Sequence, residues 1–120
     1  MTFPSRIMGA GNSPLSAQTI CGDGAVGLVA LGSTASDALQ LNVSLNTLTT
    51  SSASTGVKLP PTETGAQVII RNDSGQTITV YPYNTSSTIN AAAASVTVAT
   101  AKTILLAATS ATTWVSITGA

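Results

Sequence analysis

The sequence predicts an all-β fold from three observations. Serine, threonine and β-branched residues are abundant, whereas Glu, Lys and Arg, which favour helices, are scarce. Apolar residues alternate with polar ones in several short runs, and clusters of Gly, Pro, Asn and Ser separate these runs. A length of 120 residues suits one domain, and an apolar content of 43% is sufficient for its core.

Residues 1–24 are expected to form an extended N-terminal arm, ahead of a β-domain at 25–120. Glycine and proline recur in this arm, which disfavours both a helix and a long strand. Two interpretations stay open: a frayed terminus, or an arm that docks on a neighbouring subunit, since a disordered tail is usually more polar. In the second interpretation the contacts come from Phe3, Arg6, Ile7 and Met8.

Two strands are expected before the centre of the chain. Residues 25–31 form the first strand. In residues 38–46 apolar and polar residues alternate strictly, which predicts a half-buried strand whose core-facing residues are Leu39, Leu41, Val43 and Leu45. The Ser- and Thr-rich run at 47–55 is interpreted as a solvated loop or an irregular edge strand, in preference to a site where hydroxyls bind sugars. Residues 56–59 are then expected to return the chain to the β-domain before Pro60.

A β-hairpin is predicted at the centre of the sequence. Its strands are 67–71 and 77–81, and Asn72-Asp73-Ser74-Gly75 between them is a cluster of turn-forming residues. Side chains on a strand point to alternate sides. The core is therefore expected to contain Val68 and Ile70 from the first strand, with Ile78 and Val80 from the second.

The C-terminal third is expected to add short strands at 88–90 and 95–99 and a final hairpin of 103–107 and 113–118. Trp114 is interpreted as a core residue whose indole is hydrogen-bonded at the rim. Together the runs predict a single β-sandwich, jelly-roll-like, or a barrel, with about seven to nine short strands.

Composition argues against several classes of function. Charged residues make up only 7% of the chain and their signs balance, so no basic surface for nucleic acid is expected. The chain has no histidine and one cysteine, which excludes multi-cysteine zinc sites and Ser-His or Cys-His catalysis. The acidic residues Asp23, Asp37, Glu63 and Asp73 are scattered among turns. The sequence therefore predicts neither an enzyme nor a metal or cofactor site.

Cys21 and the chain's hydropathy add two expectations. Cys21 is either a reactive thiol or a small core residue, and the second role is favoured. No apolar run approaches the roughly 18 residues that span a bilayer, and no signal sequence follows Met1. We therefore expect no membrane contact, and synthesis in the cytoplasm.

The surface pattern predicts a homo-oligomer, with a trimer favoured over a dimer. A net charge of +0 removes the self-repulsion that keeps monomers apart. Apolar residues also remain on both sides of the runs 68–70 and 104–106, where Ile69 and Leu105 would face water in a monomer.

A series of short motifs runs through about two-thirds of the chain, from Leu39 onward. They are, in order, Val57-Lys58-Leu59-Pro60, Gly65, Val68-Ile69-Ile70-Arg71-Asn72, Gly75, Ile78-Thr79-Val80-Tyr81-Pro82, Ile89-Asn90 and Trp114. This order resembles a small β-module that recurs among virion structural proteins of tailed bacteriophages. The sequence departs from that pattern in the loop at 83–87, where glycine and aspartate commonly follow the proline.

The resemblance implies a structural protein of the virion, made in the host cytoplasm. The expected function is that of a capsid decoration or cement protein, which binds the major capsid protein on the outer shell and stabilises it. Phe3, Arg6, Ile7 and Met8 are then the candidate subunit or capsid contacts. Two alternatives stay open: a tail or tail-fibre component, which usually carries a trimeric shaft as well, and a carbohydrate-binding β-module, for which Tyr83 is the aromatic residue expected to be exposed.

Overall fold

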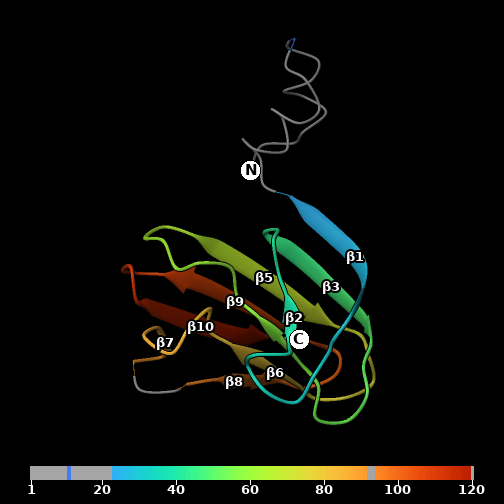
Figure 1. Cartoon of the computed structure of the whole chain (residues 1–120). Coiled ribbons are helices and arrows are strands. Elements are labelled where there is room, and N and C mark those ends of the chain that lie inside the picture. The colour runs from blue at the N-terminus through green and yellow to red at the C-terminus, as the bar shows by residue number, and fades with distance from the viewer. Residues whose placement is uncertain (1–10, 12–22, 92–93, 120) are drawn as a thin grey trace.

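The computed structural model describes residues 11, 23–91 and 94–119, and in these ranges it is all-β, as predicted (Figure 1). Ten strands in these ranges form two sheets. The six-stranded sheet contains, in spatial order, β1 (Gly24–Val29), β3 (Leu45–Thr50), β5 (Gln67–Asn72), β9 (Lys102–Ala108), β10 (Thr113–Gly119) and β7 (Thr88–Ile89). The four-stranded sheet contains β2 (Leu39–Gln40), β4 (Gly56–Lys58), β6 (Ile78–Tyr81) and β8 (Val96–Val98).

From β1 to β6 the chain alternates between the two sheets, so consecutive strands do not pair with each other. The six-stranded sheet pairs β1 with β3 and β3 with β5, all parallel. The four-stranded sheet pairs β2 with β4 and β4 with β6, also parallel. Parallel neighbours require a crossover connection, and here a strand of the opposite sheet provides it. This course is solenoid-like, and antiparallel β8, β9 and β10 follow it.

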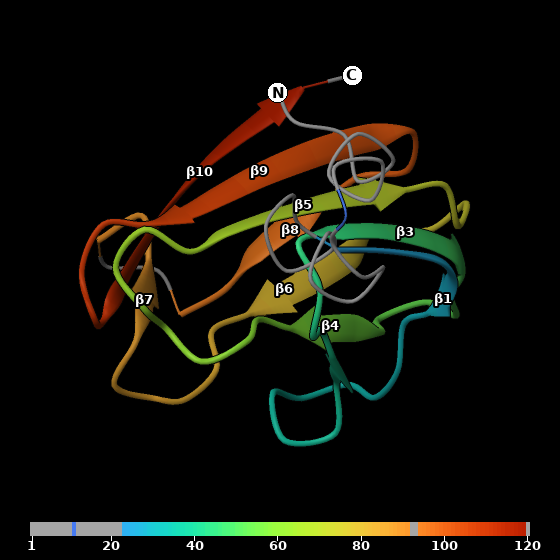
Figure 2. The same cartoon turned by 90° about the horizontal axis from the view of Figure 1, so that it is seen from above.

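One hydrophobic core lies between the two layers, which Figure 2 shows from above. Val68 and Ile70 of β5 and Ile78 and Val80 of β6 are buried, which confirms the predicted core faces. Trp114 is also fully buried, and its indole N–H donates to Thr62 Oγ1 at 3.0 Å, as expected for a core tryptophan with a polar rim. The other buried apolar residues are Ala30, Leu41, Leu48, Val57, Leu59, Ile89, Val98, Ile104, Leu106 and Ala108.

The predicted central hairpin is wrong. β5 and β6 lie in different sheets, and β5 pairs instead with β3 and β9. The turn residues after Asn72 form a corner that carries the chain across the core to the opposite sheet. A hairpin and such a corner use the same turn residues and bury the same alternate side chains, so the sequence pattern fits both. The final hairpin, β9 with β10, is confirmed.

The single strand predicted at 38–46 is also wrong. β2 ends at Gln40, the chain crosses between the sheets at 41–44, and β3 begins at Leu45. The crossing shifts the alternation by one residue, which moves every later side chain to the other face. Leu41 is buried as predicted, but Val43 is half-buried and Leu45 is exposed, while Asn46 takes the buried position. Residues 47–50 belong to β3, which lies between β1 and β5 and is therefore not an edge strand, whereas residues 51–55 form a loop, as expected.

The predicted sandwich or barrel therefore needs correction. Two layers enclose a core, as in a sandwich, but the parallel ladders and alternating course are solenoid-like and not jelly-roll-like. The ten described strands exceed the predicted number because the run at 38–46 contributes to two strands and the run at 47–55 contributes to one of them. Most of the predicted arm, including Phe3, Arg6, Ile7 and Met8, lies outside the described residues.

Candidate functional site

The outer face of the six-stranded sheet carries a row of apolar side chains that crosses four strands. In the strand register Leu45 is paired with Ile69, Ile69 with Leu105, and Leu105 with Ile117. Leu45, Ile69 and Leu105 each adjoin a buried residue in their strands, so alternation places them on the outer face. Ile117 is three residues after buried Trp114, which places it on the same outer face. We call Leu45, Ile69, Leu105 and Ile117 the apolar stripe.

The apolar stripe is open to solvent in the isolated chain. Ile117 is 72% exposed, Leu45 46% and Leu105 39%, whereas Ile69 between them is half-buried. Val115 lies two residues before Ile117 and is also exposed. Neighbouring strands are about 4.8 Å apart, so a row across four strands extends over roughly 14 Å. A contiguous apolar surface on a sheet face is typical of a binding surface.

The rim of the apolar stripe carries little net charge. The next row of the sheet contains Thr47, Arg71 and Thr103. Arg71 Nε lies 2.8 Å from Asp73 Oδ1, so this guanidinium is neutralised locally, and Arg71 Nη1 also donates to Ala101 O at 3.0 Å. The row on the other side contains Gln67, Ala107 and Val115. The surface around the stripe therefore has no unbalanced charge in the described rows.

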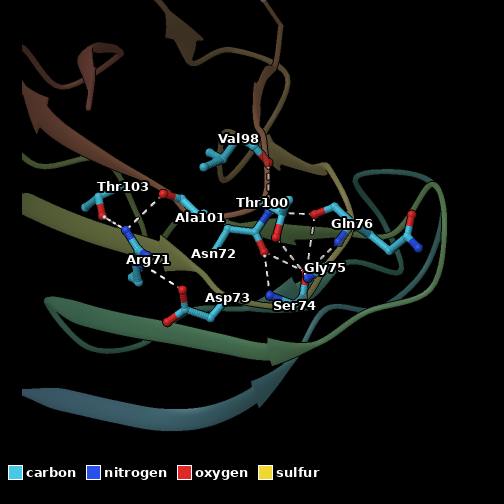
Figure 3. Close-up of polar contacts among 10 residues, drawn as sticks. All are labelled: Arg71, Asn72, Asp73, Ser74, Gly75, Gln76, Val98, Thr100, Ala101 and Thr103. Carbon is cyan, nitrogen blue, oxygen red and sulfur yellow. Dashed lines mark hydrogen bonds and ion pairs between the residues drawn. The ribbon is translucent and has the colours of Figure 1, made fainter. Parts of the chain in front are cut away.

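Asn72 fixes the corner at which the chain leaves this sheet (Figure 3). Its side chain is fully buried, and Nδ2 donates to Gln76 O at 2.7 Å and to Val98 O at 2.9 Å. Oδ1 accepts from Ser74 N at 3.0 Å and from Ser74 Oγ at 2.6 Å. All four hydrogen-bonding positions of the amide are used. The corner is thereby held to β8 of the other sheet, and Arg71, one residue earlier, is held on the outer face.

Two of the four acidic residues, Asp23 and Glu63, are closer together than their spacing in the sequence indicates. Asp23 and Glu63 line one hollow of about 350 Å³, together with Ser44 and Gln67. They lie at the same end of the six-stranded sheet, Asp23 just before β1 and Glu63 before β5, because β1, β3 and β5 run parallel. Among the described residues no three His, Cys, Asp or Glu side chains come together as a metal site.

The predicted contact residues meet different outcomes. Ile69 and Leu105 lie on the outer face of the sheet, as predicted, although Ile69 is only partly exposed. Ile117 was missed, but its alternation with buried Trp114 could have revealed it. Leu45 could not have been found, because the corner before it reverses its face. Cys21 lies outside the described residues, and Tyr83 is 41% exposed, as expected.

Comparison with protein-family models, curated proteins and solved structures finds no match to the chain. No helix in the described part of the chain is long and apolar enough to cross a membrane. The functional argument therefore rests on the surfaces of the two sheets, and on the six-stranded sheet it rests on the apolar stripe.

Proposed function

We propose that this chain is a structural protein of an assembly, a capsid decoration or cement protein on the outer shell of a tailed bacteriophage. The motif order from Val57 to Trp114 supports the virion assignment through its resemblance to a phage module. The observation that carries an assembly role is the apolar stripe, because an exposed apolar patch that crosses several strands is typical of a protein–protein contact.

The occupant of the apolar stripe is a second copy of the same chain. Two identical faces repel each other when they carry net charge, but here the charged pair at the rim, Arg71 and Asp73, is balanced. The chain as a whole also has a formal net charge of +0. Equal copies therefore meet without like-charge repulsion, and each contributes Leu105 and Ile117 to the buried centre.

The oligomer is a trimer, with a dimer as the alternative. In a trimer, three apolar stripes face a common threefold axis, whereas in a dimer two stripes lie face to face. Light scattering coupled to gel filtration measures the mass directly. A trimer has three times the 11.9 kDa of the chain, and a mass equal to that of one chain at high micromolar concentration contradicts the proposal.

A pair of lysine substitutions tests the interface. Ile117→Lys adds an ammonium group to the most exposed position of the apolar stripe and should convert the oligomer to a monomer. Thr97→Lys is the matched control, because Thr97 is exposed in the middle of β8 on the four-stranded sheet. It should leave the mass unchanged. If both variants keep the wild-type mass, the stripe is not the subunit interface.

Attachment to the shell is proposed to use the N-terminal arm, whose four candidate contact residues lie outside the described part. Phe3, Ile7 and Met8 would enter apolar pockets of the major capsid protein, and Arg6 would pair with a carboxylate. Deleting residues 1–11 should leave thermal unfolding unchanged but weaken co-sedimentation with undecorated capsids at least tenfold, or about 1.4 kcal/mol. Failure of the full-length protein to bind capsids would reject the capsid role without affecting the oligomer.

A further inference from the structure

A groove lies where β4 and β6 of the four-stranded sheet end, away from the apolar stripe. Its volume is about 560 Å³, within the range of about 300–1,000 Å³ that is usual for small-molecule sites. Its lining includes Lys58, Tyr81, Pro82, Tyr83, Asn84 and Ser95. We call it the Tyr83 groove. Neither the proposed oligomer nor the proposed capsid contact uses these residues.

The floor of the Tyr83 groove is held rigidly. Lys58 and Tyr81 are register partners in β4 and β6, and both lie on the outer face because Val57 and Val80 are buried. The Tyr81 ring lies against Gly56, where an added Cβ would be 2.8 Å from Tyr81 Cε2. The Tyr81 hydroxyl donates to Ser33 O at 3.3 Å. An aromatic ring fixed at both ends gives a ligand a preformed apolar surface.

The wall of the groove is the loop at 83–87, which is held by hydrogen bonds between its own residues. Asn84 Oδ1 accepts from Ser86 N at 3.2 Å and from Ser87 Oγ at 3.2 Å. Ser87 is buried and lies 2.9 Å from Thr62 Oγ1, the acceptor of the Trp114 indole. The loop is thus connected to the core through hydrogen bonds. Among the described residues Asn84 Nδ2 has no acceptor, so it is available to donate to a ligand.

The one cation of the groove lies beside an exposed aromatic ring. Lys58 Nζ is 5.7 Å from the centre of the Tyr83 ring, a cation–π distance. In the described part of the chain no carboxylate lies within 4.0 Å of this ammonium. The one ion pair among those residues joins Arg71 and Asp73, outside the groove. The charge of Lys58 is therefore left for an anionic group of a ligand.

We infer that the Tyr83 groove binds a saccharide that carries a carboxylate. Sugar rings present apolar C–H faces, which pack on aromatic surfaces such as Tyr81 and Tyr83, and hydroxyls, which suit small polar partners such as Asn84 and Ser95. The Lys58 ammonium supplies a charge-assisted hydrogen bond to the carboxylate. A nucleic acid is a poorer fit, because backbone binding neutralises several phosphates and the groove offers one cation.

The test uses the full-length chain with three probes: tetragalacturonate, its methyl ester, which lacks the charge but keeps the sugar rings, and a tetraglutamate peptide. Isothermal titration calorimetry measures binding, and NMR of the tyrosine rings locates it. We expect tetragalacturonate to bind at least tenfold more tightly than the ester or the peptide, with shifts at Tyr83.

Two variants assign the binding to named side chains. Tyr83→Ala should weaken tetragalacturonate binding at least tenfold, and Lys58→Gln should abolish the preference for the acid over the ester. Thr49→Ala, an exposed change in β3 of the other sheet and outside the apolar stripe, should bind like the wild type. Circular dichroism of each variant checks that the fold is kept. Absence of saccharide binding at millimolar concentration, equal binding of acid and ester, or tighter binding of the peptide would each overturn the inference.

Discussion

The two sheets share one core but present different outer faces. On the six-stranded sheet the outer face carries the apolar stripe, in which Leu105 and Ile117 are exposed. On the four-stranded sheet the outer face carries Lys58 and Tyr81 beside a groove, with Thr97 on its edge strand. An exposed apolar stripe suits a second protein surface, whereas a groove with aromatic and polar groups suits a small ligand.

The difference shows that one solenoid-like core can support two kinds of surface. Inward-facing side chains are apolar in both sheets, because both must contribute to the same core. The outward-facing positions carry no such requirement, so each sheet is free to differ there. The predictions below separate the contribution of the shared interior from those of the two outer faces.

The largest effect is expected where the two sheets are joined. Asn72→Ala removes an amide that links the corner after β5 to β8, and with it the buried hydrogen bond that Nδ2 donates to Val98 O. The free energy of unfolding should fall by about 3 kcal/mol, measured by urea denaturation.

Asn46→Ala is the matched comparison for this change. Asn46 is equally buried, but its Nδ2 donates only to Val43 O at 3.0 Å and Ile69 O at 3.4 Å, and its Oδ1 has no partner among the described residues. Removing it should cost about 1 kcal/mol, because loss of an unpaired buried carbonyl offsets part of the lost bonds. Equal losses of unfolding free energy in the two variants would show that the hydrogen bonds of Asn72 between the sheets add no more stability than those of Asn46.

A glycine in each sheet provides the second test. A Cβ at Gly56 would be 2.6 Å from Thr79 O and would also meet the Tyr81 ring, so Gly56→Ala forces the backbone or the ring to move. We expect a loss of about 2 kcal/mol. At Gly24 the nearest atom lies at 3.9 Å, so Gly24→Ala should change stability by no more than about 0.5 kcal/mol. A stable Gly56→Ala protein would mean that the Tyr81 ring is not fixed by close contact.

The existence of most strands could be predicted, because alternation marks the inward faces of β5, β6 and β9 directly. Their pairing could not. Asn72 to Gly75 favour a tight turn whether the chain folds back in the same sheet or crosses to the other one. The choice depends on partners distant in sequence, such as Val98 O for Asn72.

The candidate site was predictable to the same extent. Ile69 and Leu105 are apolar residues between two buried neighbours, which only an outward-facing position in a strand explains. Their alignment with Leu45 and Ile117 depends on strand register, which local sequence does not specify. The Tyr83 groove likewise combines β4, β6 and separate loops, so only the exposed tyrosine itself could be predicted.

A smaller effect on stability is expected from a charge in the apolar stripe. Leu105 is 39% exposed, and the aliphatic part of a lysine can cover the same surface, so Leu105→Lys should change the stability of the single subunit by no more than about 0.5 kcal/mol. Its effect is on association. Wild-type melting temperature should rise with protein concentration, because folding is coupled to assembly, whereas the variant's should not. Concentration dependence in both proteins would place the interface elsewhere.

The smallest effect is expected at Asp37, in the turn beside the Tyr83 groove. The backbone N–H of Thr34, at 2.9 Å, and then the Thr34 hydroxyl hold the pKa of this exposed carboxyl below its ordinary value of 3.8. A lowered folded pKa means that Asp37 stabilises the turn above pH 3.8 and that this contribution is lost as the pH falls through the folded pKa. Carbon NMR of the Asp37 carboxyl should show that lowered midpoint, and Thr34→Val should raise it.

Acid should therefore change the structure around the Tyr83 groove before it affects the apolar stripe. The same turn contains Ser33, whose carbonyl accepts the Tyr81 hydroxyl, so protonation of Asp37 should shift the Tyr81 ring signals while the Ile117 methyl signals stay in place. Asp37→Asn is the control, because it cannot ionise and should remove this part of the titration. If the Tyr81 signals titrate equally in the Asn variant, another acid is responsible and the turn does not support the groove.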